Sequence, residues 1–135
     1  MTKEEFIKDS MFDIGEVNPY SKYFTKTSYL NMLVSNAKVP VGFVTFEPGC
    51  INHWHSHSGG QILIVTAGRG YYQEWNKEPI ELHKGDVINI KPGVKHWHGA
   101  SKDSRFSHIA IEVPGNEAKG EWMEPVDINE YQKLK

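Results

Sequence analysis

Cysteine is nearly absent from this chain. Its 135 residues include only Cys50, so an internal disulfide is impossible and a zinc site made of several thiolates is excluded. A chain without disulfides is typical of a reducing compartment. Cys50 follows a Pro48-Gly49 turn, and we interpret it as a packed thiol, because a catalytic thiol requires a base beside it.

Blocks of positive charge and long apolar runs are also missing. The net charge is −2 at pH 7, which argues against a nucleic acid or a membrane surface as the main partner. Residues 1–6 carry charges where a secretory signal needs an apolar run, and no stretch is long enough to span a bilayer. We therefore expect a cytoplasmic protein with a small-molecule ligand.

Capping-box patterns occur near both ends of the chain, as Thr2 with Glu5 and as Asp127 with Glu130. They predict two short helices, at residues 3–8 and from 128 to about 133. Between them, short apolar runs alternate with turn residues. Seven runs are predicted as strands, at residues 24–34, 41–46, 62–67, 71–75, 80–82, 87–90 and 106–113.

The connections between these runs are short. Residues 13–21 show no periodicity and are predicted as a loop or an arm, and residues 68–70, Gly-Arg-Gly, are interpreted as a turn between two strands. Short strands at such close spacing predict an all-β fold, either a sandwich or a closed barrel. The length fits one domain.

A cluster of metal-binding side chains follows the second predicted strand. His55 and His57 stand two residues apart, so their imidazoles project from one face of an extended backbone. Gln61 returns an amide oxygen to that side after a Gly-Gly turn. Such neutral donors suit a first-row divalent metal, and His96 is the candidate fourth ligand.

Two other histidines complicate this assignment. His53 has the same parity as His55 and His57, so any two of the three are possible ligands on geometry alone. The spacing to Gln61 favours the later pair and leaves His53 at the rim or behind the ligands. His83 is interpreted as a solvated turn residue.

Two glycine-containing segments resemble the motifs of the cupin superfamily. In the first segment Gly49, His55, His57 and Gly68 are in register, with Gln61 where the family usually has Glu. In the second, Gly85, Gly93 and His96 are in place, whereas Lys91 and Ala100 replace the usual Pro and Asn. The alternative is a β-rich domain whose histidines are polar surface residues.

This resemblance implies one cupin β-barrel, a double-stranded β-helix of the jelly-roll type, with short terminal helices. We then expect residues 1–34 to form the N-terminal helix, an arm and the first strand, and residues 35–135 to form the barrel with its closing helix. In cupins such arms often cross to a second subunit, so the resemblance also implies a homodimer.

Within the cupins, the chain most resembles small bacterial manganese-dependent cupins with hydroxynitrile lyase activity, and cupins related to carboxymuconolactone decarboxylase. The matching segments run from about Gly42 to the C-terminus and include 44–49, 61–68, 96–100, 108–111 and 122–124. The likeness implies metal ligands at His55, His57, Gln61 and His96. It places His98 and His108 facing the active site, and Gly42, Val44 and Asn52 bordering it.

The expected ligand set leaves the metal with its full charge. Three imidazoles and one amide are neutral, whereas the usual Glu would neutralise part of the charge, so the ion is a stronger Lewis acid. Manganese is the metal that the resemblance implies. Iron, nickel, zinc and copper accept the same ligands, so the metal does not follow from the residues.

Two histidines are candidates for proton transfer. His98 lies two residues after His96 and points the same way if the segment is extended. His108 shares a parity with Glu112, and this face of the predicted strand points either into a wet pocket or out to solvent. Glu112 stands where the lyases carry Gln, and an inward carboxylate would repel cyanide and suggest a different substrate.

The leading hypothesis is a metal-dependent cupin enzyme that makes or breaks a carbon–carbon bond next to a hydroxyl or carbonyl group of a small organic substrate. Its model reaction is the cleavage of cyanohydrins to aldehyde and cyanide, with His98 or His108 moving the proton. A cupin dioxygenase is one alternative, which oxygen consumption with a catechol or a flavonol would reveal. A non-catalytic metal or small-ligand binding module is the other. It would keep its affinity after His98 is replaced, with no turnover to lose.

Overall fold

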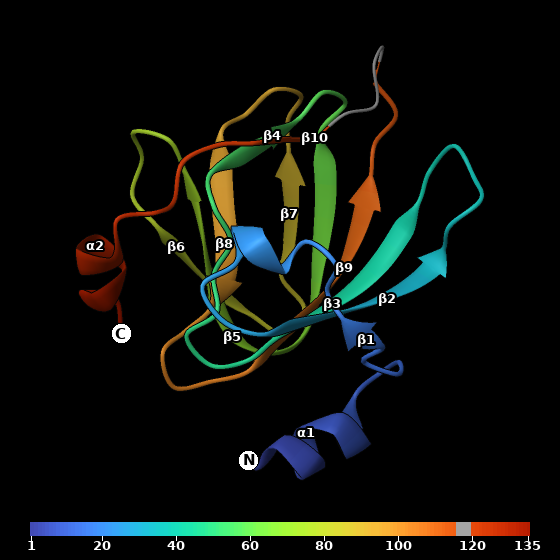
Figure 1. Ribbon diagram of the computed structural model, residues 1–135, viewed down its shortest axis with the longest axis vertical. Helices are drawn as coiled ribbons and strands as arrows, with labels where there is room; N and C mark the ends of the chain where they lie inside the picture. The colour runs from blue at the N-terminus through green and yellow to red at the C-terminus, as the bar shows by residue number, and fades with distance from the viewer. Residues whose placement is uncertain (116–119) are drawn as a thin grey trace.

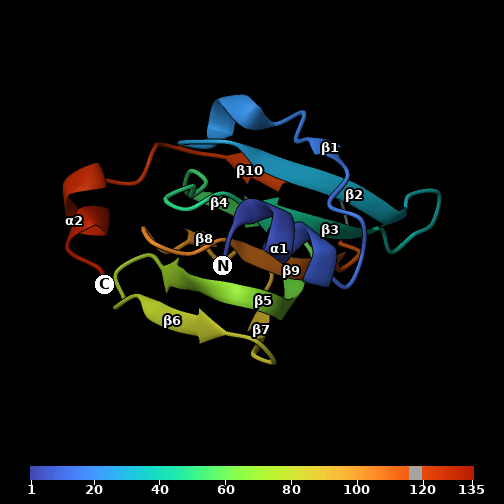
Figure 2. The ribbon, with the colours of Figure 1, turned by 90° about the horizontal axis from the view of Figure 1, so that it is seen from below.

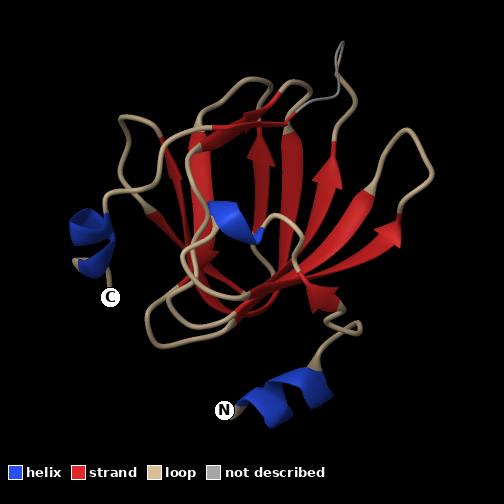
Figure 3. Cartoon of the chain, viewed as in Figure 1, coloured by secondary structure: helices blue, strands red, loops and turns tan. Residues whose placement is uncertain are grey.

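The computed structural model describes residues 1–115 and 120–135 and consists mostly of antiparallel β-strands (Figures 1 and 3). The elements in order are α1 (Lys3–Asp9), β1 (Glu16–Val17), a 3-10 turn (Ser21–Tyr23), β2 (Ser28–Val34), β3 (Val41–Phe46), β4 (His55–His57), β5 (Gln61–Glu74), β6 (Ile80–His83), β7 (Val87–Ile90), β8 (His96–Ala100), β9 (Phe106–Glu112), β10 (Gly120–Trp122) and α2 (Ile128–Gln132). Within the described residues, no helix is long and apolar enough to cross a membrane.

The strands form a curled sheet in the order β1-β2-β3-β9-β5-β8-β4-β10, with β6 and β7 also paired to β5. Figure 2 shows the result as two layers, with β2 and β3 in one and β5, β6 and β7 in the other. The all-β prediction is confirmed. The curl matters for function because it faces the inner sides of β3, β4, β8 and β9 toward one another.

β5 contradicts the prediction of a turn at residues 68–70, because it continues as one strand of fourteen residues. Gly68 has φ +79°, next to a register shift between Val65 and Ala67, so the strand bends without ending. A Cβ on Gly70 would lie 2.3 Å from the Gly99 carbonyl oxygen. These glycines therefore permit a bend and a close approach of strands.

The predicted helices are confirmed, and four short strands, β1, β4, β8 and β10, lie outside the predicted runs. Thr2 and Glu5 form the expected capping box, and Asp127 caps α2 by accepting from the Asn129 amide. The prediction of a loop over residues 13–21 was wrong in part, because Glu16–Val17 pairs with β2. β10 was not predicted either, since it exists only by pairing with β4.

Two apolar clusters hold the barrel together. The first, around Phe46, Leu63 and Phe106, packs between the layers, and the second joins Trp97 and Tyr131 of α2. Cys50 belongs to the first cluster and is completely buried, with Sγ 3.4 Å from the Lys26 carbonyl oxygen. Burial raises the pKa of the Cys50 thiol to about 12, as expected of a packed, unreactive cysteine.

Candidate metal centre

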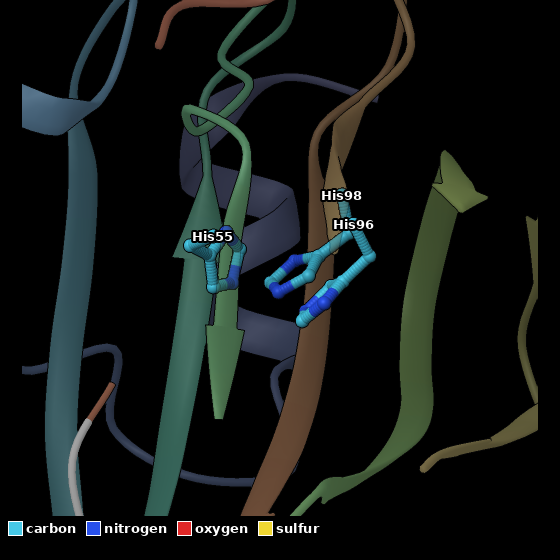
Figure 4. A group of neighbouring side chains, drawn as sticks. All are labelled: His55, His96 and His98. Atoms are coloured by element: carbon cyan, nitrogen blue, oxygen red, sulfur yellow. The ribbon is translucent and has the colours of Figure 1, made fainter. Parts of the chain in front are cut away.

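Three buried histidines meet where β4 pairs with β8. His55 lies directly opposite His96 in the antiparallel register, and His98 follows on the same face of β8. One ligand atom from each of the three lies within 4.8 Å of the others. Figure 4 shows the His55 ring facing those of His96 and His98 across the gap between the strands.

Backbone carbonyls fix the tautomers of two of these rings. His55 Nδ1 donates to the His53 carbonyl oxygen at 2.8 Å, and His96 Nδ1 donates to the Val94 carbonyl oxygen at 2.9 Å. Since a carbonyl only accepts, Nδ1 carries the hydrogen and Nε2 keeps its lone pair. Burial lowers the pKa of both rings, to about 4 for His96, so both are neutral near pH 7.

His57 and Gln61 lie beside this group. The His57 ring centroid is 5.1 Å from that of His55 and 5.5 Å from that of His96. Gln61 opens β5 and lines the same cavity as His55, His57 and His98. Of the four predicted ligands, His55 and His96 thus belong to the compact group of three, whose third member is His98, and His57 and Gln61 stand at its side.

The residues present fit a divalent metal ion. Gln61 Oε1, His57 Nε2 and His96 Nε2 are buried and have no hydrogen-bond partner among the described residues. Buried acceptors without a donor are costly, and a cation satisfies several of them at once. Imidazole nitrogens with an amide oxygen form a donor set that first-row divalent metals accept.

His98, the third member of this group, also pairs with another buried ring, that of His108. Their centroids lie 4.9 Å apart in an edge-to-face arrangement. Asn52 holds His98 in place, because its Oδ1 accepts from the His98 backbone N–H at 3.0 Å. In the part of the chain that the structure describes, both ring nitrogens of His108 and Nδ1 of His98 lack a hydrogen-bond partner. Burial lowers the pKa of both rings, to about 4 for His108.

The strand β9 turns its polar face inward, which the sequence left open. His108 is completely buried, and it and Glu112 line the same cavity, whereas Ile109 and Ile111 are only partly buried. His108 lies between the rings of Phe46 and Phe106, at 5.5 and 5.6 Å. The inward face therefore carries two ionisable side chains into the interior of the barrel.

A cavity of about 220 Å³ opens onto His55, His57, His98 and His108. All four residues predicted to border a pocket, Gly42, Val44, Asn52 and Glu112, line it. Most of its wall is apolar, and sequence reasoning missed the aromatic part contributed by Tyr20, Phe24 and Trp122. The Trp122 indole stacks on Tyr23 at 4.5 Å and lies 4.8 Å from the His55 ring.

The two remaining histidines, His53 and His83, are not among the residues that line the cavity. His53 Nδ1 donates to the Met123 carbonyl oxygen at 3.2 Å, and its ring packs edge-on against Tyr23. His83 is exposed at the end of β6. Neither one belongs to the compact group of His55, His96 and His98.

Comparison with known proteins agrees with this geometry. The model of the cupin domain matches residues 42–112. An (R)-mandelonitrile lyase from Granulicella tundricola is 44% identical over 90 residues, which are 67% of this chain and 69% of that protein. The crystal structure of a cupin-like protein from Thermotoga maritima superimposes with a TM-score of 0.87 at 44% identity, covering 93% of this chain and 96% of that one.

More distant structures show the fold alone. A protein with a double-stranded β-helix domain from Klebsiella pneumoniae has a TM-score of 0.63 at 23% identity, over 92% of this chain and 96% of that one. The expected resemblance is confirmed by a domain match that spans the residues from Gly42 on β3 to Glu112 on β9. The chain therefore belongs to the cupin family.

Proposed function

We propose that this protein is a metal-dependent lyase that cleaves a cyanohydrin to an aldehyde and hydrogen cyanide. The observation that carries the proposal is the buried, neutral pair His98 and His108 beside a histidine cluster at one side of an apolar cavity. The name of the Granulicella tundricola relative supports the same reaction. A metal at this place acts as a Lewis acid toward the substrate hydroxyl.

The proposed ligands are His55, His57, Gln61 and His96, and the proposed metal is manganese. The free acceptor atoms of His57, Gln61 and His96 support this set. His98 is close enough to compete for the role, but its Nε2 lies 3.4 Å from Asn52 Nδ2 and it contacts His108. We assign His98 to the proton-transfer pair because its ring packs against His108, whose two ring nitrogens have no hydrogen-bond partner among the described residues.

The proposed reaction needs one proton acceptor. A neutral ring nitrogen of His98 or His108 takes the hydroxyl proton, and the carbon–cyanide bond breaks with its electron pair leaving on cyanide. The former hydroxyl oxygen becomes the aldehyde carbonyl. The imidazolium then returns its proton to cyanide, which the lowered pKa of both rings favours.

The cavity wall supports an apolar group on the substrate. Phe24, Val44, Phe46 and Trp122 provide a surface on which an aromatic ring can pack. Glu112 lies inward but contacts Gln61 and sits beside His57, away from the His98 and His108 pair. We therefore place the leaving cyanide next to His98 and His108, where the negative charge of Glu112 repels it least.

The test is reconstitution with manganese, iron, nickel, zinc or copper, followed by assays of aldehyde release from a panel of cyanohydrins that includes mandelonitrile. We expect release with manganese. If no metal supports release, the lyase proposal is wrong. Oxygen uptake with a catechol or a flavonol would then indicate a dioxygenase, and metal binding without any turnover would indicate a binding module.

A further inference from the structure

Glu112 contacts two of the four proposed ligands at once. It is the last residue of β9 and pairs directly with Gln61, the first residue of β5. Gln61 Nε2 donates to Glu112 Oε2 at 3.5 Å. His57 Nδ1 lies 2.9 Å from Oε1, an ion-pair distance, although the ring is not aligned for a hydrogen bond.

A carboxylate in this place selects how each partner is oriented. Because its oxygens only accept, Glu112 favours the Gln61 amide with Nε2 toward β9 and Oε1 toward the cluster. It likewise favours the His57 tautomer that carries hydrogen on Nδ1 and a lone pair on Nε2. The structure agrees with this orientation of Gln61, since its Oε1 is among the buried atoms without a hydrogen-bond partner in residues 1–115 and 120–135; both ring nitrogens of His57 are among them too.

The other two proposed ligands are held in the same way by different groups. The His53 and Val94 carbonyl oxygens accept from Nδ1 of His55 and His96. One side chain thus contacts both His57 and Gln61, by a hydrogen bond from Gln61 and at an ion-pair distance from His57, whereas two backbone carbonyls hold the remaining pair. It also adds a negative charge directly behind a ligand set that is otherwise neutral.

We propose that Glu112 is a positioning residue for the metal, which orients His57 and Gln61 and supplies the negative charge that the ligands themselves lack. This inference rests on the proposed metal-binding function. It gives a role to a residue that departs from the Gln of the lyases that the chain resembles. It also predicts that metal affinity depends on a residue that does not touch the metal.

The first test is Glu112→Gln, which keeps the size of the side chain. Its amide has a single oxygen where the carboxylate presents one oxygen to Gln61 and the other to His57, so the Gln61 amide is free to turn Nε2 toward the cluster. We expect Mn²⁺ affinity, measured by calorimetry, to fall about 10- to 100-fold. The nitrogen couplings in the electron paramagnetic resonance spectrum of bound Cu²⁺ should also change.

The matched control is Glu121→Gln, because Glu121 is exposed on β10 and its substitution removes the same charge near the cavity mouth. This variant should bind Mn²⁺ within about twofold of the wild type, since screened surface charges act weakly. An equal loss in both variants would mean that overall charge, rather than positioning, controls affinity, and would overturn the proposal.

The second test exchanges the two side chains, as Gln61→Glu with Glu112→Gln. In the exchanged protein the new amide at position 112 donates to the new carboxylate at position 61, and its oxygen faces His57 Nδ1. Because position 61 is itself a proposed ligand, the reference is Gln61→Glu alone, in which two carboxylates face each other. We expect the exchanged protein to bind Mn²⁺ more tightly than this reference. Equal affinity would mean that the residue at position 112 does not position the ligand at position 61, and the comparison also serves if Glu112→Gln alone proves unfolded by circular dichroism.

Two outcomes separate this inference from the proposed function. If the wild type binds no divalent metal, the proposed function fails and the inference fails with it. If the wild type binds Mn²⁺ and Glu112→Gln binds it equally tightly with the same Cu²⁺ spectrum, only the role of Glu112 is wrong.

Discussion

At the level of single residues, His57 and His98 are alternative candidates for the third histidine ligand, beside His55 and His96. We predict that His57→Ala loses metal affinity by at least about tenfold, because it removes a ligand. His98→Ala should retain the metal and lose turnover by about 100-fold or more, because it removes a proton acceptor. Metal content by mass spectrometry and aldehyde release give the two readouts.

His53→Ala is the matched control for these substitutions, since its ring packs against Tyr23 outside the cavity. It should leave metal content and turnover close to those of the wild type. The reverse pattern, in which His98→Ala loses the metal and His57→Ala keeps it, would show that the compact group His55, His96 and His98 is the ligand set.

Two buried imidazoles make stability depend on pH in the metal-free protein. Burial lowers the pKa of His96 and of His108 from 6.5 to about 4. Between these values the unfolded chain binds protons that the folded chain does not, so the free energy of unfolding falls as pH is lowered through this range. Each residue contributes a loss on the order of 3 kcal/mol by pH 4.

The measurement is urea unfolding in the presence of a chelator at pH 7 and at pH 4.5. His108→Phe, in a site already flanked by Phe46 and Phe106, should reduce the difference in stability between the two pH values. An unchanged difference in that variant would contradict the assignment of His108 as a buried neutral ring.

Alternation along extended backbone was enough to predict that His55 and His57 share a face and that His98 follows His96. It was not enough to predict distances between strands, and so it missed that a ring nitrogen of His98 lies within 4.8 Å of ligand atoms of both His55 and His96. The contact of Trp122 with His55 was equally hidden, because it depends on the pairing of β10 with β4.

At the level of the strands, β5 depends on glycine for close packing. A Cβ on Gly70 would meet the Gly99 carbonyl oxygen at 2.3 Å and the Phe106 ring at 2.8 Å, so we expect Gly70→Ala to cost about 2–3 kcal/mol of stability. Gly93→Ala is the comparison. Apart from its chain neighbours, no atom of the described residues would lie within 4 Å of the added Cβ, and only the φ of +74° opposes a side chain. It should cost about 1 kcal/mol.

Urea unfolding of the two glycine variants at neutral pH checks this order. A smaller loss for Gly70→Ala than for Gly93→Ala would mean that β8 and β5 separate easily, against the packing described. This contact also explains why a turn was wrongly predicted at residues 68–70. Glycine is typical both of turns and of close contacts between strands, and only the position of Gly99 in the structure distinguishes the two.

The terminal helices were predicted almost to the residue, because capping depends on side chains within one turn of the chain. β1 and β10 were not predicted, because strands of two and three residues have no periodicity of their own. Sequence signals within one turn thus predicted the terminal helices, whereas the short edge strands form only by pairing with distant segments.

For the whole molecule, the cupin resemblance predicts a homodimer. Apolar residues are exposed at the β1 and β2 edge of the sheet, with Val17 60%, Met32 42% and Val34 41% exposed. We expect light scattering to show a dimer, and Val17→Lys to shift it toward monomer, because charge on an edge strand opposes pairing. Ile80→Lys, on β6, is the control.

A wild-type protein that stays monomeric at every concentration tested would contradict the prediction of a dimer and leave the description of the cavity unchanged. A dimer that Val17→Lys leaves intact would place the interface elsewhere on the surface. The four proposed ligands lie close together on one chain, so loss of the dimer alone is not expected to abolish metal binding.

The lone thiol at Cys50 provides a built-in probe of breathing motions. It is completely enclosed and holds its proton tightly, so a chromogenic disulfide reagent reacts only during moments when the interior opens. The labelling rate then measures how often that happens. Comparing it with and without Mn²⁺ would reveal whether an ion at the histidines slows the opening of the barrel around them.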